Sequence, residues 1–154
     1  MSQATDLSIR QAQEAFAQQG LMDTLQAEIV RIEAGRVDVA MPVRPEITQQ
    51  DGFVHAGAVT AILDTACGFA ASTLMPPGSG VLSVDFTVHL MRPSVGEQIL
   101  AVAEVVKPGR TITFVRAEAF AIRANGDRVS CALMTASMAT ISPDQRPTTR
   151  SSPE

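Results

Sequence analysis

The stretch GAVTAILDTACGFAASTLM, residues 57–75, is mostly apolar and is the strongest indication of the fold. It contains no proline, and apolar side chains fall on nearly every face of the helix that its spacing predicts. A helix of this kind is wrapped by protein rather than laid on a surface, so we expect the rest of the chain to surround it. Pro76, Pro77 and Gly78 follow at once and end the helix.

The residues on either side of this helix alternate in the manner of β-strands. Downstream, four strands are expected within residues 82–91, 99–107, 111–123 and 129–140. The turns between them are short, which favours antiparallel neighbours. Upstream, residues 25–41 predict a hairpin around Ala34-Gly35. The sequence therefore predicts an α+β fold in which about six antiparallel strands curl around one long helix.

The length of 154 residues fits a single domain, which we place at residues 1–141. Within residues 1–20, Ile9, Ala12 and Phe16 are spaced as in an amphipathic helix that Gly20 ends. Residues 142–154 are rich in proline, serine, threonine and charge, and they predict a disordered tail.

Charge and composition limit the possible partners and location. Twelve basic against 16 acidic residues give a net charge of −4, which offers no basic face for nucleic acid. No apolar run approaches the roughly 18 residues of a membrane-spanning helix, and the polar start does not resemble a secretory signal. Cys67 and Cys131 lack metal-ligand spacing, so we expect two buried free thiols, no metal and a cytoplasmic protein.

One ionisable side chain interrupts the apolar stretch. Between Ala56 and Val84, Asp64 is the only acidic or basic residue. Burying a carboxylate without partners costs considerable free energy. Either the Asp64 face of the helix reaches solvent or a structural hydrogen bond, or Asp64 is a general base or nucleophile at a cleft.

The start of the same helix offers a second chemical feature. The first backbone N–H groups of a helix have no partner within it, so those of Ala56 and Gly57 could stabilise an oxyanion. Asp64 lies about 10–12 Å further along, at 1.5 Å per residue. Both features can reach one substrate only if one of them comes from a facing surface, which favours a symmetric dimer.

Two side chains near the helix start allow more than one interpretation. The Gln49 amide could orient a carbonyl or a water molecule, although a solvated loop residue is the simpler interpretation. His55 could take part in catalysis, although a histidine at a helix start is more often a structural hydrogen-bonding group.

Two stretches resemble a known family. QQDGFVHAG at residues 49–57, followed by AILDTA at 61–66, resembles the His-Gly-Gly signature of hotdog-fold acyl-CoA thioesterases of the phenylacetate-degradation (PaaI-like) type. LSVDF at 82–86 and LMRPSVG at 90–96 resemble the strand and turn that follow. Where the signature has its first glycine this chain has Ala56, which keeps the backbone N–H.

The resemblance implies an enzyme that hydrolyses an acyl- or aryl-CoA thioester to a free acid and CoA. It implies that Asp64 attacks the thioester or activates water, that Gln49 and Ser83 hold the water, and that the Ala56 N–H polarises the carbonyl. It also implies a homodimer, commonly assembled into a homotetramer, with each site at a dimer seam. Coenzyme A is then part of the substrate, and no other cofactor is expected.

The same resemblance suggests where the substrate lies. Coenzyme A carries phosphates, and the cations expected to meet them are at turns: Arg92, Lys107 and Arg110. The acyl group is expected beside the long helix, against residues such as Phe53, Ile62, Phe69 and Phe86.

Three other functions remain open. The first is a non-catalytic protein that binds or senses acyl-CoA on the same fold. The second is an enoyl-CoA hydratase or dehydratase, because related folds use a histidine and an acid on carbon–carbon bonds. The third is a purely structural dimer, which leaves Asp64 without a role.

Overall fold

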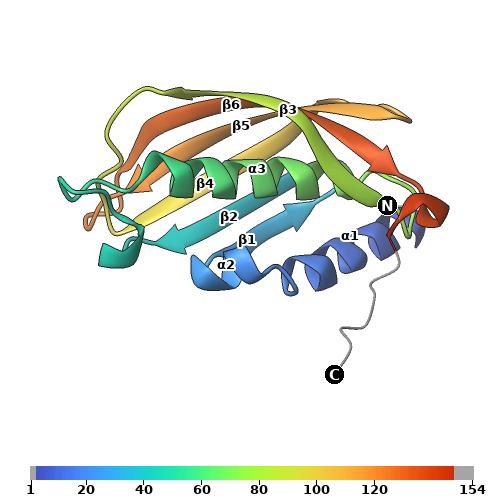
Figure 1. Ribbon diagram of the computed structural model, residues 1–154, viewed down its shortest axis with the longest axis horizontal. Helices are drawn as coiled ribbons and strands as arrows, with labels where there is room; N and C mark the ends of the chain where they lie inside the picture. Colours follow the sequence, from blue (N-terminus) through green and yellow to red (C-terminus); the bar gives the residue numbers. More distant parts are fainter. Residues whose placement is uncertain (1–2, 148–154) are drawn as a thin grey trace.

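The structure is a computed structural model that describes residues 3–147, with the side chain of residue 4 left aside (Figure 1). Its helices are α1 (Gln3–Phe16), α2 (Gly20–Thr24), α3 (Ala56–Ser72) and two 3-10 turns, η1 (Pro45–Ile47) and η2 (Pro143–Gln145). Its strands are β1 (Glu28–Glu33), β2 (Arg36–Pro42), β3 (Gly80–Leu90), β4 (Gln98–Lys107), β5 (Ile112–Ile122) and β6 (Arg128–Ile141).

The six strands form one antiparallel sheet that curves around α3 (Figure 1). The strand order is β1-β2-β4-β5-β6-β3. This confirms the predicted α+β fold with a long central helix and six strands around it. The hairpin predicted around Ala34-Gly35 is β1–β2, and Gly35 adopts the positive φ of 75° that its turn requires.

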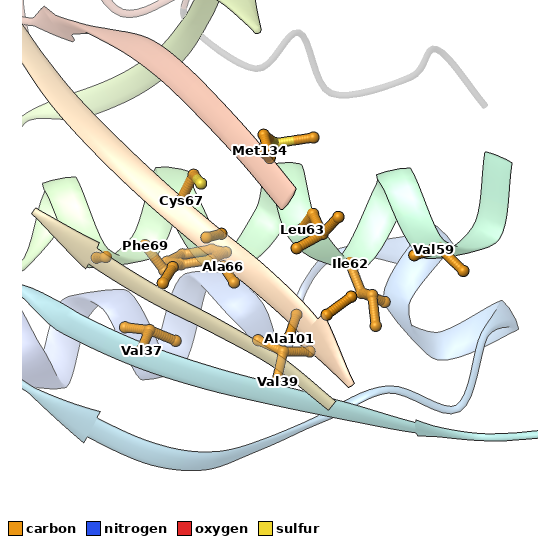
Figure 2. Close-up of a cluster of buried hydrophobic side chains, with 14 of the residues drawn as sticks. Val37, Val39, Val59, Ile62, Leu63, Ala66, Cys67, Phe69, Ala101 and Met134 are labelled. Atoms are coloured by element: carbon orange, nitrogen blue, oxygen red, sulfur yellow. The ribbon is translucent and has the colours of Figure 1, made fainter. Parts of the chain in front are cut away.

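The core lies between α3 and the concave face of the sheet. Figure 2 shows α3 side chains such as Ile62, Leu63 and Ala66 in one cluster with side chains of the strands, among them Val39 and Ala101. All five of these residues are completely buried. Alternate residues of β4, β5 and β6 supply the other side of the core because the side-chain period of a strand is two.

The long helix is not wrapped on every side, contrary to the expectation from its composition. One side of α3 is fully buried, whereas Ala61, Asp64, Thr65 and Gly68 on the other side are only half-buried. Ala61 and Gly68 add to the apolar composition of α3, but residues this small do not require protein over this side. The half-buried side of α3 therefore remains open to a substrate or a partner.

The position of β3 differs from the expectation that short turns join neighbours. β3 pairs only with β6 and is an edge strand, while β4 lies between β2 and β5. Residues 91–97 cross the end of the sheet, where the Met91 N–H donates to Cys131 O and the Glu97 N–H donates to Ile122 O. β3 and β4 are three strand spacings apart, or roughly 14 Å. The seven residues between them reach about 23 Å when extended, which is enough to cross that distance.

The apolar face of β3 does not point into the core as its alternation predicts. A bulge between Ser83 and Asp85 shifts the register against β6. Four apolar side chains of this strand are 43–62% exposed: Leu82, Val84, Phe86 and Leu90. Ser83, in contrast, faces α3, because its side chain hydrogen-bonds to that helix.

The N-terminal helix packs against the end of α3. The rings of Phe16 and Phe69 meet edge to face with their centroids 5.7 Å apart, and Ser8 Oγ donates to Met75 O (2.9 Å). This confirms the amphipathic helix predicted at the start of the chain. None of the helices within residues 3–147 has the length and hydropathy to cross a membrane.

The end of the chain departs from the disordered tail expected from Ser142 onward. Ser142 and Gln145 form a reciprocal capping box around η2. The rest of the expected tail, residues 148–154, lies outside the described residues.

Candidate active site

Asp64 and Ser83 form a hydrogen-bonded pair between α3 and the edge strand. The Ser83 hydroxyl donates to Asp64 Oδ1 over 2.6 Å, the short distance expected of a bond to a carboxylate. The bulge beside Ser83 lies at this point of β3. Because only Oδ1 is engaged by the serine, Oδ2 is available to a ligand or a water molecule.

Cys67, one turn after Asp64, is excluded as a nucleophile. Its side chain is completely buried. Burial, and to a smaller extent the charge of Asp64, raises the pKa of the Cys67 thiol to about 12. The thiol therefore stays protonated at neutral pH, which leaves Asp64 as the candidate reactive group on this part of α3. Cys67 and Cys131 are both buried and free, as predicted.

The backbone at the start of α3 is held in place by His55. The His55 N–H donates to Ile47 O (2.8 Å), and its C=O accepts from the N–H of Ala58 (3.0 Å) and Val59 (3.3 Å). Its ring caps the helix, because Nδ1 accepts from the Gly57 N–H (2.8 Å). With Nδ1 as the acceptor, a neutral His55 carries its proton on Nε2.

Only one of the two predicted oxyanion donors is open. The Gly57 N–H is engaged by the His55 ring, whereas the Ala56 N–H has no hydrogen-bond partner among residues 3–147. Gly57 has a different role: a Cβ at this position would lie 3.0 Å from His55 Nδ1 and 3.2 Å from Cε1. The missing side chain leaves room for the ring, and of the two candidate donors only the Ala56 N–H remains available.

Gln49 belongs to a tight loop ahead of α3. The Gln49 N–H donates to Phe53 O (2.8 Å), the Gly52 N–H donates to Gln49 O (3.0 Å), and Gln49 Oε1 accepts from the Asp51 N–H. Gly52 has a φ of 84°, which favours glycine. The Nε2 group of Gln49 remains available as a donor to a substrate or water, and its hydrogen bonds do not involve Asp64.

The predicted site residues therefore form two separate groups within one chain. Gln49, His55 and Ala56 lie at the start of α3, and Asp64 and Ser83 lie further along it. Eight residues of helix separate Ala56 from Asp64, or about 12 Å. A single substrate carbonyl does not span that distance within one protomer.

The three predicted phosphate-binding cations are not brought together either. Arg92 lies near the start of α3, because the neighbouring Ser94 O accepts from the N–H of Val54, just ahead of that helix. The Arg92 Nη1 group donates to Ser130 O (2.9 Å). Lys107 and Arg110 lie at the opposite end of β4 and β5. A full strand length of about 30 Å separates the two places.

Two of the four residues expected to line an acyl site belong to the core. Ile62 is completely buried, and Phe69 packs on Phe16. Phe53 and Phe86 are more than one third exposed and remain accessible. A cavity of about 290 Å³, which sequence reasoning missed, opens beside His55 and Gly57. Its other walls come from α2 and η1. These elements pack near α3 through tertiary contacts, which the local sequence pattern does not predict.

Similarity to known proteins agrees with this geometry. A family model described as "Thioesterase superfamily" matches residues 51–125. The crystal structure of a thioesterase family protein from Silicibacter pomeroyi is 43% identical, with a TM-score of 0.83 over 89% of this chain and 98% of that one. The PaaI protein of the E. coli phenylacetic acid degradation operon is 18% identical, with a TM-score of 0.77 over 90% and 96%, and shows likeness of fold.

Two curated sequences are also similar. Human acyl-coenzyme A thioesterase 13 is 29% identical over 110 residues, 70% of this chain and 78% of its own. A putative esterase from Halobacterium salinarum is 29% identical over 98 residues, 60% of this chain. This chain spans 64% of the length of the Halobacterium protein, slightly less than two thirds.

Proposed function

The chain belongs to the thioesterase superfamily and has the hotdog fold, and from that premise we propose that it hydrolyses an acyl-CoA thioester to a free acid and CoA. The observation that carries the proposal is the pairing of two features: a carboxylate held by Ser83 and an unpartnered amide at Ala56. A base and a fixed oxyanion donor are what acyl transfer to water requires.

In the proposed reaction Asp64 acts as the general base. Its Oδ2 takes a proton from water, and the water oxygen attacks the thioester carbon while the carbonyl electrons move onto the oxygen. The Ala56 N–H stabilises that oxyanion, and the Gln49 Nε2 group orients the water or the carbonyl. The intermediate then collapses, the C–S bond breaks, and the CoA thiolate takes the proton from Asp64.

We further propose that the site is completed by a second copy of the chain, joined through β3. Four exposed apolar side chains, Leu82, Val84, Phe86 and Leu90, follow one another along β3, where Asp85 is the one exposed carboxylate. The other edge strand, β1, carries three charged residues, Glu28, Arg31 and Glu33. Charges protect a free edge, and a row of apolar side chains along an edge favours pairing. In a two-fold pair, the Asp64 of one protomer faces the Ala56 amide of its partner.

The proposed assembly and substrate include two further features. Two such dimers form a homotetramer, for which exposed Phe114 and Val106 offer apolar contact area on the sheet. The guanidinium of Arg92, at the end of the sheet where α3 begins, binds a CoA phosphate, and Lys107 and Arg110 are placed to do so only on another protomer. No cofactor is needed, because every step uses side chains, backbone and water.

Asp64→Asn tests the proposed function. The amide cannot accept the proton from water, so kcat should fall by about 10²–10⁴-fold, the usual contribution of a general base. The measurement is thiol release from a series of acyl-CoAs, with the melting temperature as a check on folding. The control Asp6→Asn removes an exposed carboxylate of α1 and should keep wild-type turnover.

Two outcomes contradict the proposal. An Asp64→Asn enzyme with near-normal thiol release removes the role of the carboxylate. Acyl-CoA that the wild-type protein binds and returns unhydrolysed identifies a binding protein instead, and loss of enoyl-CoA absorbance without thiol release identifies a hydratase.

A further inference from the structure

A cavity of about 290 Å³ lies next to the proposed oxyanion donor. His55 and Gly57, the residues on either side of Ala56, both line it. The acyl carbon chain of a thioester begins one bond from the carbonyl oxygen that Ala56 would hold. A cavity that starts at the neighbours of Ala56 is therefore in reach of that chain.

The walls of this cavity are mostly apolar. α3 contributes the small side chains Ala58 and Ala61, and η1 contributes Ile47. α2 contributes Leu21, and the residue that follows this helix, Leu25, also lines the cavity. Leu21 is 56% exposed, although leucine is an apolar residue. A ligand in the cavity would cover it and remove apolar surface from water.

The charge of the lining restricts the ligand further. No lysine or arginine lines the cavity, and Glu46 is its one carboxylate. Glu46 forms an ion pair with Arg44 (3.5 Å), which lies outside the lining. A negatively charged acyl group, such as that of a dicarboxylic acid, would find no free cation among the lining residues. The lining therefore favours an uncharged, apolar group.

Building on the thioesterase function proposed above, we propose that this cavity holds the acyl group of the substrate and limits its size. A cavity of about 150 Å³ accommodates benzene, so about 290 Å³ accommodates roughly ten non-hydrogen atoms. The substrate class is the CoA thioester of an uncharged acid of medium length, or of one aromatic ring on a short linker. Acyl chains of 16 carbons exceed this volume.

The larger cleft of the molecule is a poor acyl site by the same criteria. It has about 630 Å³ and lies between α1 and the start of β3. Its lining includes Gln11, Glu14, Gln18 and Arg146. Such polar and charged groups lose hydration without compensation when a hydrocarbon chain covers them.

The test measures kcat/KM for straight-chain acyl-CoAs from acetyl to palmitoyl, and for the CoA thioester of an acid with one aromatic ring on a short linker, in the wild type and three variants of the full chain. Ala61→Met fills the cavity and should lower the octanoyl-to-acetyl ratio at least about tenfold, since one methylene in such a pocket changes selectivity by that factor or more. Leu21→Ala enlarges it at an exposed position and should move the optimum to longer chains. The control Ala15→Met places the same side chain in the larger cleft and should keep the wild-type profile.

Each result supports or overturns the assignment. An unchanged chain-length profile in both Ala61→Met and Leu21→Ala overturns it. A profile shortened by Ala15→Met instead assigns the acyl group to the cleft beside α1. Wild-type protein that hydrolyses none of the series overturns the thioesterase function itself, whereas hydrolysis with an unaltered profile overturns only the assignment of the cavity.

Discussion

The peptide between His55 and Ala56 is fixed by the residues around it. Its C=O accepts two helical N–H groups, the His55 N–H is bound to Ile47, and the His55 ring is bound to Gly57. A donor held in this way needs no reorganisation when negative charge develops in front of it. In the proposed mechanism His55 positions the Ala56 amide, and Asp64 carries out the proton transfer.

Ala56→Pro should remove the oxyanion donor with little other change. Proline lacks the N–H but is favoured at the first position of a helix, and His55 already has the extended backbone (φ −61°, ψ 133°) that proline requires before it. We expect kcat to fall about 10²–10³-fold, the cost of one oxyanion donor. Circular dichroism and the melting temperature should match the wild type. Unchanged turnover would show that the amide takes no part.

Mixing Ala56→Pro with Asp64→Asn tests whether two protomers share a site. In a mixed dimer, one of the two sites combines an intact Ala56 amide with an intact Asp64 from the other protomer. After unfolding and refolding together, roughly a quarter of wild-type activity should return, because half of the dimers are mixed and each has one active site. Sites confined to single protomers would give no recovery.

Cys67 should be inert although it lies one turn from Asp64. Its raised pKa of about 12 keeps the thiol protonated, so iodoacetamide at pH 8 should leave both Cys67 and activity intact. Between pH 9.0 and about 12 only the unfolded chain loses this proton, so the free energy of unfolding should fall as pH rises. The free energies of unfolding of wild type and Cys67→Ala, measured by denaturant titration, should therefore approach each other as the pH rises across that range. Rapid inactivation by iodoacetamide would refute this.

At the scale of elements, α3 contains two glycines that its composition does not distinguish. Gly57 lies against the His55 ring, whereas a Cβ on Gly68 would meet only Val81 Cγ1, at 3.9 Å. Glycine inside a helix costs about 0.5–1 kcal/mol relative to alanine. The same substitution should therefore have opposite effects at the two positions.

Gly68→Ala should stabilise the protein, and Gly57→Ala should damage the site. We expect Gly68→Ala to add about 0.5–1 kcal/mol, or a few degrees in Tm. In Gly57→Ala the new methyl group displaces the ring that holds the Ala56 peptide, so kcat should fall about 10–100-fold with KM nearly unchanged. Calorimetry and steady-state kinetics on both variants measure this. Equal behaviour of the two variants would remove the role given to the His55 cap.

The elements themselves could be predicted from sequence to a large extent. The helix from residue 57 and the strands after it follow local periodicity and turn residues, which is why their bounds agree closely with α3 and β3–β6. The pairing of β3 could not be predicted, because an edge strand and a central strand show the same alternation. The burial of Ile62 and the role of Gly57 likewise depend on residues that are distant in sequence or on ring geometry.

For the whole molecule, the proposed association of two copies rests on a contrast between the two sheet edges. Val30 on β1 and Val84 on β3 are equally accessible, 55% and 59% exposed. On β1, however, Arg31 and Glu33 form an ion pair beside Val30 (2.8 Å). The β3 edge, with four exposed apolar side chains, is therefore the edge through which we propose that two protomers pair.

Val84→Lys should break the proposed dimer, and Val30→Lys should not. A lysine at the centre of an interface loses hydration and meets its own copy across the two-fold axis, so the protomers should separate. Light scattering after gel filtration should give the mass of one protomer for Val84→Lys and the wild-type mass for Val30→Lys. Thiol release should disappear with the dimer. A Val84→Lys protein of wild-type mass would place the interface elsewhere.

The crossover from β3 to β4 has a consequence for biosynthesis. As the chain leaves the ribosome, β3 emerges before β4, β5 and β6, so its partner within the sheet is made last. Until then, the nascent chain exposes the apolar face of α3 and both unpaired edges of β3. Translation therefore produces an intermediate that is prone to aggregate, and its yield in cells should depend on chaperones that shield it until β6 is complete.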